Sequence, residues 1–335
     1  MATLANPKHK VIIVNQKTGT KYDVTGALTD LYLDESENGV AQKATLKLPQ
    51  LKHEGSYITS LINMRDGVFV YADTGSGNVE VFRGYVWKKK YKRSETDELE
   101  LIAYDRLIWF KESEEYKFYA AGKSTKSIFQ DVCSAKSVNL TYNHQSVTHS
   151  KLVIKGSLAD AFENTLLEEV RKKTGKRGIL RATKGDIEVI TEGNGNSTVY
   201  QFYFGEGGNI ISTEHTETYD GITTKVIIIG SETADKQAPI RATVKGNTAA
   251  HGTVQKIITS SDSDNLADLK AEADQRIKDY GEPQKSVSVT AVNNPWVRKG
   301  DKIHLNDGYV SGYAHVKSVS HDALKATMSM ELRMV

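Results

Sequence analysis

A strict alternation of apolar and polar residues is the feature that most constrains how this chain can fold. The clearest case is the last stretch, "ATMSMELRM" (326–334), in which the apolar residues Met328, Met330, Leu332 and Met334 alternate with polar residues. Successive side chains of a β-strand point to opposite faces of its sheet, so this pattern is typical of a half-buried strand. The stretch "KATLKLP" (43–49) has the same pattern. Both ends of the chain are therefore predicted to be mainly β.

The N-terminal part of the chain is predicted to form about six strands with short connections. "DGVFVYAD" (66–73) and "NVEVFRGYVWKK" (78–89) flank a glycine-rich turn and read as a hairpin, and "DELELIAYD" (97–105) supplies the next strand. One brief helical segment is expected at 56–63. These features predict an antiparallel, barrel-like first domain over residues 1–112.

The hydrophobic period changes from two to that of a helix after residue 112. Ser124 or Thr125 can cap a helix that carries Ile128, Phe129 and Val132 on one face. Ser157 begins a second helix, which ends at a glycine and is followed by two short strands in "GILRATKGDIEVITEG" (178–193). Residues 113–198 are thus predicted to form a small α+β domain.

Strands return from residue 199 onward and continue to the end of the chain. One helix, at about 264–280, interrupts them, and Gly281 and Pro283 close it. We expect a second barrel-like domain over residues 199–335. The predicted fold class is mainly β with an α+β insert, in which two antiparallel β-barrel-like domains flank the small α+β domain.

Composition excludes several classes of function. The 335 residues carry 44 Lys and Arg against 42 Asp and Glu, a net charge of +2, which gives no excess of positive charge for gripping nucleic acid. No apolar run approaches the roughly 20 residues of a membrane helix, and the N-terminus lacks the apolar core of a signal peptide. The chain is therefore expected to be made and kept in the cytoplasm, or to leave it without a signal. The single cysteine, Cys133, is interpreted as a small core residue.

Few residues suggest a site for a metal or a phosphate. His144 and His149 lie in a polar loop without further ligands at a suitable spacing, so a metal site is not assigned. "FGEGGN" (204–209) is rich in glycine, but no Lys-Ser/Thr pair and no helix follow it, so it is interpreted as a turn.

Acidic pairs and one basic run are the remaining candidates. Glu168-Glu169 is expected on a solvated helix and Glu114-Glu115 in a polar linker, and neither is assigned a catalytic role. "WKKKYKR" (87–93) interleaves aromatic and basic residues, a pattern that anionic partners can use, but it is interpreted as a strand end and hairpin tip.

The adjacent residues Tyr104, Asp105 and Arg106 could form a catalytic trio or a structural corner. A strand is predicted to end at Ala103, after which Asp105 can accept hydrogen bonds from backbone donors that follow it. No substrate anchor is evident nearby. The corner is therefore the preferred interpretation, and no catalytic, cofactor-binding or metal-ligating residue is assigned.

The order of several short motifs resembles one protein family. "VFRGYV" (81–86), followed by "AYDRLIWFK" (103–111), is similar to the first-barrel signature of tail hub proteins of contractile phage tails, especially XkdQ-like hubs in the superfamily of late control protein D. The resemblance runs from about residue 66 to the end through "GEGGNIIS", "TYDGITTKVIIIG", "AEADQRIKDYGEPQKSVSVTA", "VRKGDKIHL", "GYAHVKSVSHD" and "MSMEL".

The resemblance implies a structural role without catalysis or cofactors. Two tail-tube-like barrels per subunit and three subunits per ring would form a trimeric adaptor between the hexameric tail tube and the trimeric central spike. The implied partners are further copies of the chain, the tube or tube-initiator protein and the spike, with tape-measure and baseplate-wedge proteins as further candidates. Membrane insertion and sequence-specific nucleic acid binding are not implied. The implied location is the baseplate of a virion or phage-tail-like bacteriocin, assembled in the bacterial cytoplasm.

Two alternatives remain open at this point. A peptidoglycan hydrolase of the tail tip would release soluble sugar from purified cell walls. A receptor-binding tail module would attach saturably to intact cells. A hub would do neither and would instead bind tube and spike subunits.

Overall fold

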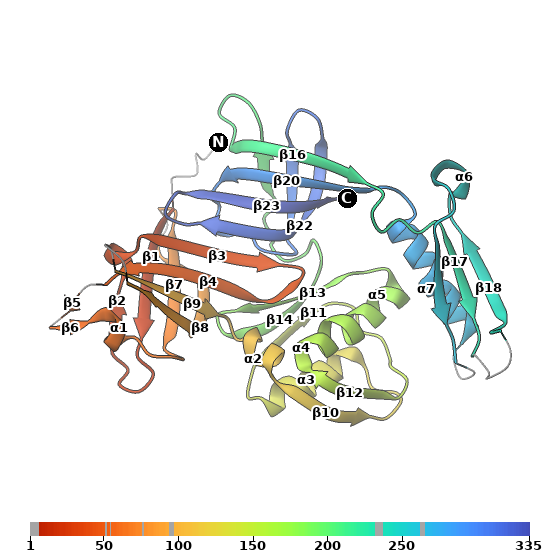
Figure 1. The fold of residues 1–335 in the computed structure, drawn as a ribbon, viewed down its shortest axis with the longest axis horizontal. Helices are drawn as coiled ribbons and strands as arrows, with labels where there is room; N and C mark the ends of the chain where they lie inside the picture. The colour runs from red at the N-terminus through yellow and green to blue at the C-terminus, as the bar shows by residue number, and fades with distance from the viewer. Residues whose placement is uncertain are drawn as a thin grey trace.

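The computed structural model describes residues 7–50, 52–53, 55–75, 77–93, 97–231, 237–261 and 265–335. One large sheet runs across the upper and left parts of the molecule, a unit with several helices lies below it, and a small lobe projects to the right (Figure 1). None of the helices in these ranges combines the length and the apolar character needed to cross a bilayer.

The large sheet contains strands from both ends of the chain. Its main path joins eleven strands in the following order: β16 (Ile210–Thr218), β20 (Gln284–Val292), β23 (Thr327–Met334), β22 (Ser311–Asp322), β3 (Asp30–Ser36), β4 (Gly39–Pro49), β9 (Glu98–Tyr104), β8 (Val79–Lys92), β7 (Gly67–Asp73), β1 (Lys8–Val14) and β2 (Lys21–Asp23). Two more strands branch from this path, β21 (Lys302–Asn306) on β22 and β15 (Tyr200–Tyr203), which is parallel to β21. The prediction of a mainly β protein is confirmed.

The two ends of the chain meet at strand β22. One side of β22 pairs with β23 along most of its length, while the other side pairs with β21 over residues 311–315 and with β3 over residues 318–322. Two separate barrel-like domains were expected, but β22 and β3 instead join both sets of strands into one sheet. Within the described residues, the strand pairs close neither set into a barrel.

The N-terminal strands enclose a mainly aliphatic core, to which the expected hairpin contributes one face with Val68, Val70 and Val86. The predicted pairing of β7 with β8 is confirmed, and β8 pairs in turn with β9. Gly84 allows the close approach of these strands, since a Cβ at this position would lie 2.3 Å from the Tyr104 carbonyl oxygen. Short elements complete this part: η1 (Thr25–Ala27), β5 (Lys52–His53), β6 (Ser56–Tyr57) and α1 (Ile58–Leu61), a single turn where a longer helix was predicted.

The middle part of the chain is an α+β unit with its own core. Its helices cover a three-stranded sheet and a two-stranded sheet. The elements are α2 (Leu107–Glu112), β10 (Glu114–Tyr119), α3 (Thr125–Ala135), β11 (Leu140–Asn143), β12 (Leu152–Ser157), α4 (Leu158–Asp160), η2 (Ala161–Leu167), α5 (Glu168–Thr174), β13 (Gly178–Thr183) and β14 (Asp186–Thr191). Cys133 is buried in this core, as predicted.

Both predicted helices of this unit form, but the second is irregular. Ser124 is the N-cap of α3, and its hydroxyl accepts a hydrogen bond from the Ser127 backbone N–H. Residues 161–167 of the second helix form a π-helix, in which each turn holds an extra residue. Leu166 and Leu167, at the end of this segment, are both buried in the core.

A separate lobe forms from strands that were expected in the second barrel. β17 (Lys225–Ile229) lies between β18 (Ile240–Lys245) and β19 (Gln255–Thr259) in a three-stranded sheet. α7 (Leu266–Tyr280) packs on this sheet through Ala273 and its apolar neighbours, and α6 (Thr248–His251) connects β18 to β19. The predicted helix is thus confirmed over the described residues, but it covers a small sheet of its own. The domain boundaries expected at residues 112 and 198 stay predictions.

The predicted register of the last strand is confirmed. Met328, Met330 and Leu332 are buried and Met334 is half-buried, while Ser329 is exposed on the opposite face.

We predict that Leu332→Asp lowers the free energy of unfolding by several kcal/mol, because it removes apolar packing and buries an unpaired charge. Ser329→Ala is the matched control and should change stability by less than about 0.5 kcal/mol. Denaturant titration of the two variants measures the difference. Equal midpoints would contradict the register, since a slip by one residue exchanges the two faces of a strand.

Candidate functional site: a buried ionic junction

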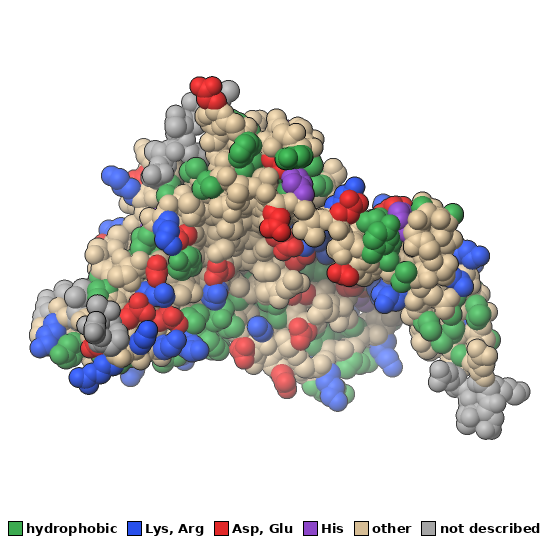
Figure 2. Space-filling model, turned by 45° about the horizontal axis from the view of Figure 1, so that its top comes forward, with side chains coloured by type: hydrophobic (Ala, Val, Ile, Leu, Met, Phe, Trp, Pro, Cys, Tyr) green, Lys and Arg blue, Asp and Glu red, His purple; other side chains and the backbone are tan. Residues whose placement is uncertain are grey.

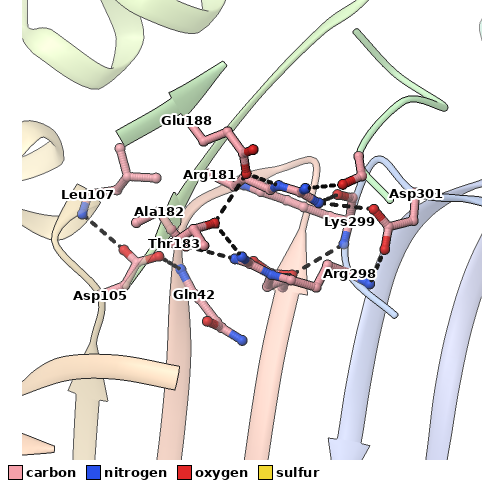
Figure 3. A network of polar contacts seen from close by, with 12 residues as sticks. Gln42, Asp105, Leu107, Arg181, Ala182, Thr183, Glu188, Arg298, Lys299 and Asp301 are labelled. Carbon is pink, nitrogen blue, oxygen red and sulfur yellow. Dashed lines mark hydrogen bonds and ion pairs between the residues drawn. The ribbon is translucent and has the colours of Figure 1, made fainter. Parts of the chain in front are cut away.

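Charged side chains gather where the three parts of the chain meet. Glu35 comes from β3, Arg181 from β13, and Arg298, Lys299 and Asp301 from the loop before β21. We call these five residues the ionic junction. Figure 3 shows the side chains of Arg181, Arg298 and Asp301 converging from strands and loops that are far apart in the sequence.

The Arg298 guanidinium is the centre of the ionic junction. Its Nε donates to Glu35 Oε2 at 3.1 Å, and its Nη2 donates to Glu35 Oε1, so that the pair is bidentate. The same guanidinium donates to the Ala182 carbonyl and the Thr183 hydroxyl, both at 3.0 Å. The side chain of Glu35 is 1% exposed. One cation therefore joins β3 and β13 to the loop that carries it.

Electrostatics favour the charged form of Glu35. Burial raises the pKa of this carboxyl group, but the positive charges of Arg298, Lys299 and Arg181 outweigh that effect and lower the pKa to about 2. The carboxylate also accepts a hydrogen bond from the Lys299 backbone N–H at 3.2 Å. Its ionised state is thus an integral part of the folded structure.

Lys299 anchors the turn between β3 and β4. Its buried Nζ donates to the carbonyl oxygens of Gly39 at 2.8 Å, Val40 at 3.0 Å and Ser36 at 3.4 Å. Burial lowers the pKa of this amine, and the Glu35 carboxylate opposes the shift. Three carbonyl acceptors match the three donors of an ammonium group, which explains how this charge is accommodated in the interior.

Arg181 connects the α+β unit to the C-terminal strands. Its Nη1 donates to Asp301 Oδ1 at 3.0 Å, its Nε to Glu188 at 2.8 Å, and its Nη2 to the Gly195 carbonyl at 2.7 Å. A Cβ at Gly195 would lie 2.3 Å from Asp301 Oδ1, so the backbone passes directly against the ion pair.

A second group of charges extends this connection toward the surface. Arg333 of β23 bridges Glu192, at 2.5 Å, and Glu37, at 2.8 Å. Lys317 of β22 lies 2.8 Å from Glu331 and 3.5 Å from Glu37. Polar contacts in the interior and closer to the surface thus hold together the same three parts of the chain.

Asp105 forms the predicted corner at the edge of this region. Its Oδ1 accepts from the Leu107 N–H at 2.9 Å and its Oδ2 from the Gln42 N–H at 3.0 Å, as Figure 3 shows. Burial raises the pKa of this carboxyl group to about 7. Both oxygens are occupied by backbone donors and the residue is buried, so this geometry supports the structural interpretation of the trio.

The structure separates the other candidate residues. His144 Nδ1 lies 2.8 Å from the Thr191 hydroxyl and His149 Nε2 lies 2.8 Å from the Thr125 hydroxyl. Within the described ranges, no group of three or more His, Cys, Asp or Glu side chains could hold a metal ion. "FGEGGN" is a turn between β15 and β16, as predicted, in which Gly205 and Gly207 have positive φ.

The acidic pairs and the basic run lie on helix α5 and on strands β10 and β8. Glu168 pairs with Arg171 at 3.1 Å and Glu169 with Lys173 at 2.9 Å, along the surface of α5. Glu114-Glu115 lies on β10 rather than in a linker. The basic run lies at the distal end of β8, as predicted, although the hairpin tip at 94–96 is outside the described residues.

The sequence pattern does not identify the ionic junction as a whole, but it carries one signal for it. In "LYLDES" the alternation that buries Leu31 and Leu33 also points Glu35 inward. A carboxylate at an inward position needs a buried cation as partner. Nothing local identifies that cation as Arg298, which lies 263 residues away along the chain.

We predict that Glu35→Gln destabilises the protein by about 3–5 kcal/mol, because it leaves the buried Arg298 without its counter-charge. The neighbouring Asp34→Asn is a matched control. Asp34 pairs with Lys43 at 2.8 Å on the partly exposed face of the same strand, so its loss should cost less than about 1 kcal/mol. Thermal or denaturant unfolding compares the variants, and equal losses would show that the ionic junction is not a structural anchor.

The buried imidazole of His321 predicts a dependence of stability on pH. Burial lowers the pKa of His321 to about 4. The unfolded imidazole takes up its proton near pH 6.5 and the folded one does not, so stability falls as the pH is lowered from about 7 toward 4. This one group contributes at most about 1.4 kcal/mol per pH unit. His321→Gln should flatten the decline measured by denaturant unfolding, and an unchanged decline would refute this assignment.

Comparisons with known proteins bear on the family. The fold is similar to that of a tail protein from Neisseria meningitidis MC58, with 13% identity, a TM-score of 0.71, and coverage of 98% of this chain and 96% of that chain. It is also similar to the 43 kDa tail protein of prophage MuSo2 from Shewanella oneidensis, with 13% identity, a TM-score of 0.73, and coverage of 97% and 98%.

A third similar structure is the E. coli c3393 protein, a component of the type VI secretion system with structural similarity to the T4 bacteriophage tail proteins gp27 and gp5. It has 7% identity, a TM-score of 0.59, and coverage of 97% of this chain and 77% of that chain. No curated protein matches the sequence. The YQBQ-like family model matches residues 32–335. The resemblance to phage tail and baseplate proteins is therefore confirmed, and the chain belongs to the YQBQ-like family.

Proposed function

We propose that this protein is the hub of a contractile-tail baseplate, in which three copies form a ring that joins the hexameric tail tube to the trimeric central spike. The coarser role, that of a structural tail or baseplate protein, follows from the family and from the shared fold over nearly the whole chain. The similar fold of a chain in the Francisella PdpA-VgrG complex supports a place beside a VgrG-type partner.

One observation carries the finer proposal: the large sheet has a long free edge. Among the described residues, β16 pairs only with β20, and its nine residues are mostly exposed. An exposed strand edge presents unpaired backbone donors and acceptors, which favour addition of a strand from another chain. If β16 of one copy pairs with a different strand of the next copy, the contact is head-to-tail. Successive copies related by a suitable fixed rotation then close into a ring.

Two sets of strands in each copy match the symmetry that a hub has to bridge. We take the strands around β1–β9 and those around β20–β23 as two units that each resemble a tube subunit. Three copies then present six such units to a sixfold tube and three equal contacts to a threefold spike. The ionic junction keeps the two sets in a fixed relation, as this role requires.

The proposed role involves no catalysis and no cofactor. The paired carboxylates Glu168 and Glu169, considered above as catalytic candidates, each have a cationic partner one helical turn away. The proposed partners are the tube or tube-initiator protein and the central spike, with tape-measure and baseplate-wedge proteins as further contacts. The proposed location is the baseplate of a virion or phage-tail-like particle.

We predict that three copies of this chain are present in its complex with the spike and tube proteins. Light scattering or native mass spectrometry of the co-expressed complex measures its mass and so the number of copies. Thr216→Pro and Glu217→Pro test the role of β16, because consecutive N–H groups point to opposite sides of a strand. The variant that loses the N–H directed toward β20 should be destabilised, because it loses a hydrogen bond within the sheet. The variant that loses the N–H at the free edge should fold normally and fail to form the ring.

Two or six copies in this complex would contradict the trimeric hub. A ring that forms equally well with both proline variants would contradict the role of the β16 edge.

A further inference from the structure

A pocket with two unpaired arginines lies between the N-terminal strands and the α+β unit. Its volume is about 270 Å³, and Arg65, Arg106 and Lys136 lie around the apolar side chains of Trp109 and Phe110. Within the part of the chain that the structure describes, neither arginine has a carboxylate partner, whereas Lys136 pairs with Glu115 at 2.5 Å. The pocket thus holds two cationic groups without counter-charges.

The first arginine, Arg65, is held in place by its backbone. Arg65 has a φ of +69°, which is unusual for a residue other than glycine. Its N–H donates to the Val86 carbonyl at 2.8 Å, and the next residue, Asp66, is buried with both carboxylate oxygens accepting from backbone N–H groups. The turn directs the guanidinium over the Trp109 ring, 5.3 Å from its centroid. Arg65 is therefore positioned rather than free in solvent.

The second arginine, Arg106, has a buried hydrogen-bond donor without an acceptor. Arg106 Nε is buried without any partner, and the single contact of its guanidinium is a long one, 3.5 Å from Nη2 to the Tyr85 hydroxyl. Buried donors are normally paired, and an unpaired one in a pocket calls for a group that is not part of this chain. A guanidinium fork is suited to a carboxylate or a phosphate.

The surroundings favour a peptide over a nucleic acid. Trp87 and Tyr85 contact Trp109 edge-on, with centroids 4.9 Å and 6.1 Å away, and Arg65 covers a ring face. The Trp109 ring is therefore poorly placed to stack on a base, which single-stranded nucleic acid binding sites require. The exposed lysines of "WKKKYKR" continue from Trp87 along β8, and Lys and Arg side chains gather at this lower left end of the molecule in Figure 2.

We infer that this pocket binds an acidic peptide segment of a partner protein, with a carboxylate on Arg106 and Arg65 and an apolar side chain against Trp109. Lys88 and Lys90 of β8 would then receive further acidic residues of the same segment, whereas Lys89 already donates to the Thr59 and Ile62 carbonyls. The inference does not depend on the hub assignment, because the pocket is lined by β8, α2, α4 and the segment after α3 and does not include the free edge at β16.

The test uses the full-length protein and two capped peptides, Ac-GEFEEG-amide and its neutral counterpart Ac-GQFQQG-amide. The chain has three tryptophans, so the indole N–H signals in a two-dimensional NMR spectrum report on them separately. The acidic peptide should shift the signals of Trp109 and Trp87 and leave that of Trp296, which lines a different pocket, unchanged. The neutral peptide should cause no saturable shift.

Substitutions identify the residues that bind. Arg106→Gln and Arg65→Gln should each weaken binding of the acidic peptide by about tenfold or more, the loss expected for a charge-assisted hydrogen bond. Arg106 makes only one long contact, so its variant is expected to fold normally. The double variant Lys270→Gln, Lys278→Gln removes two exposed charges from α7 and should bind as the unchanged protein does.

Three results would overturn the inference. They are equal binding of the neutral peptide, unchanged binding by both arginine variants, and tighter binding of a single-stranded oligodeoxynucleotide that shifts the same tryptophan signals. Each is distinguishable from a failure of the hub assignment, which is measured by the number of copies in the complex.

Discussion

The bidentate pair between Glu35 and Arg298 is the contact on which the arrangement of the whole chain depends. It lies at the place where β22 meets β3, and the same guanidinium reaches two groups of β13. Lys299 beside it fixes the turn that leads from β3 to β4. Apolar packing forms the main core of each part of the molecule. The pairing of β22 with β3 and these polar contacts join the parts to one another. Removing one partner of such a buried pair costs more than the pair itself contributes, so this orientation is sensitive to single changes at either residue.

A fixed orientation suits the proposed role better than a flexible one. A hub has to hold one set of strands toward the tube while another contacts its neighbours. A hinge between the two sets would disturb the match between the sixfold tube and the threefold spike. The free edge at β16 and the pocket around Trp109 lie on different parts of the structure. The two proposed contacts, with another copy of the chain and with an acidic segment of a partner, therefore use separate surfaces.

Local patterns in the sequence predict much of the secondary structure. The alternation at Met328, Met330 and Leu332 determines the faces of β23, and the hydroxyl of Ser124 marks the start of α3, because both signals involve residues close together in the chain. The joining of β22 to β3 has no local signal, since Asp34 and Ser320 are separated by 286 residues. The ionic junction has no complete local signal for the same reason, although the inward position of Glu35 indicates that a buried cation has to be present. The motifs around Gly84 were informative because a close approach of strands requires that residue.

The most direct test of the trimeric hub is an electron-microscopy reconstruction of the assembled particle that contains this protein. A trimeric hub predicts density for three copies on the tail axis, between the last ring of the tube and the spike, with the sheet of each copy continued across β16 into its neighbour. Density for this chain in a peripheral fibre, away from the tube axis, would contradict it and would favour a receptor-binding role.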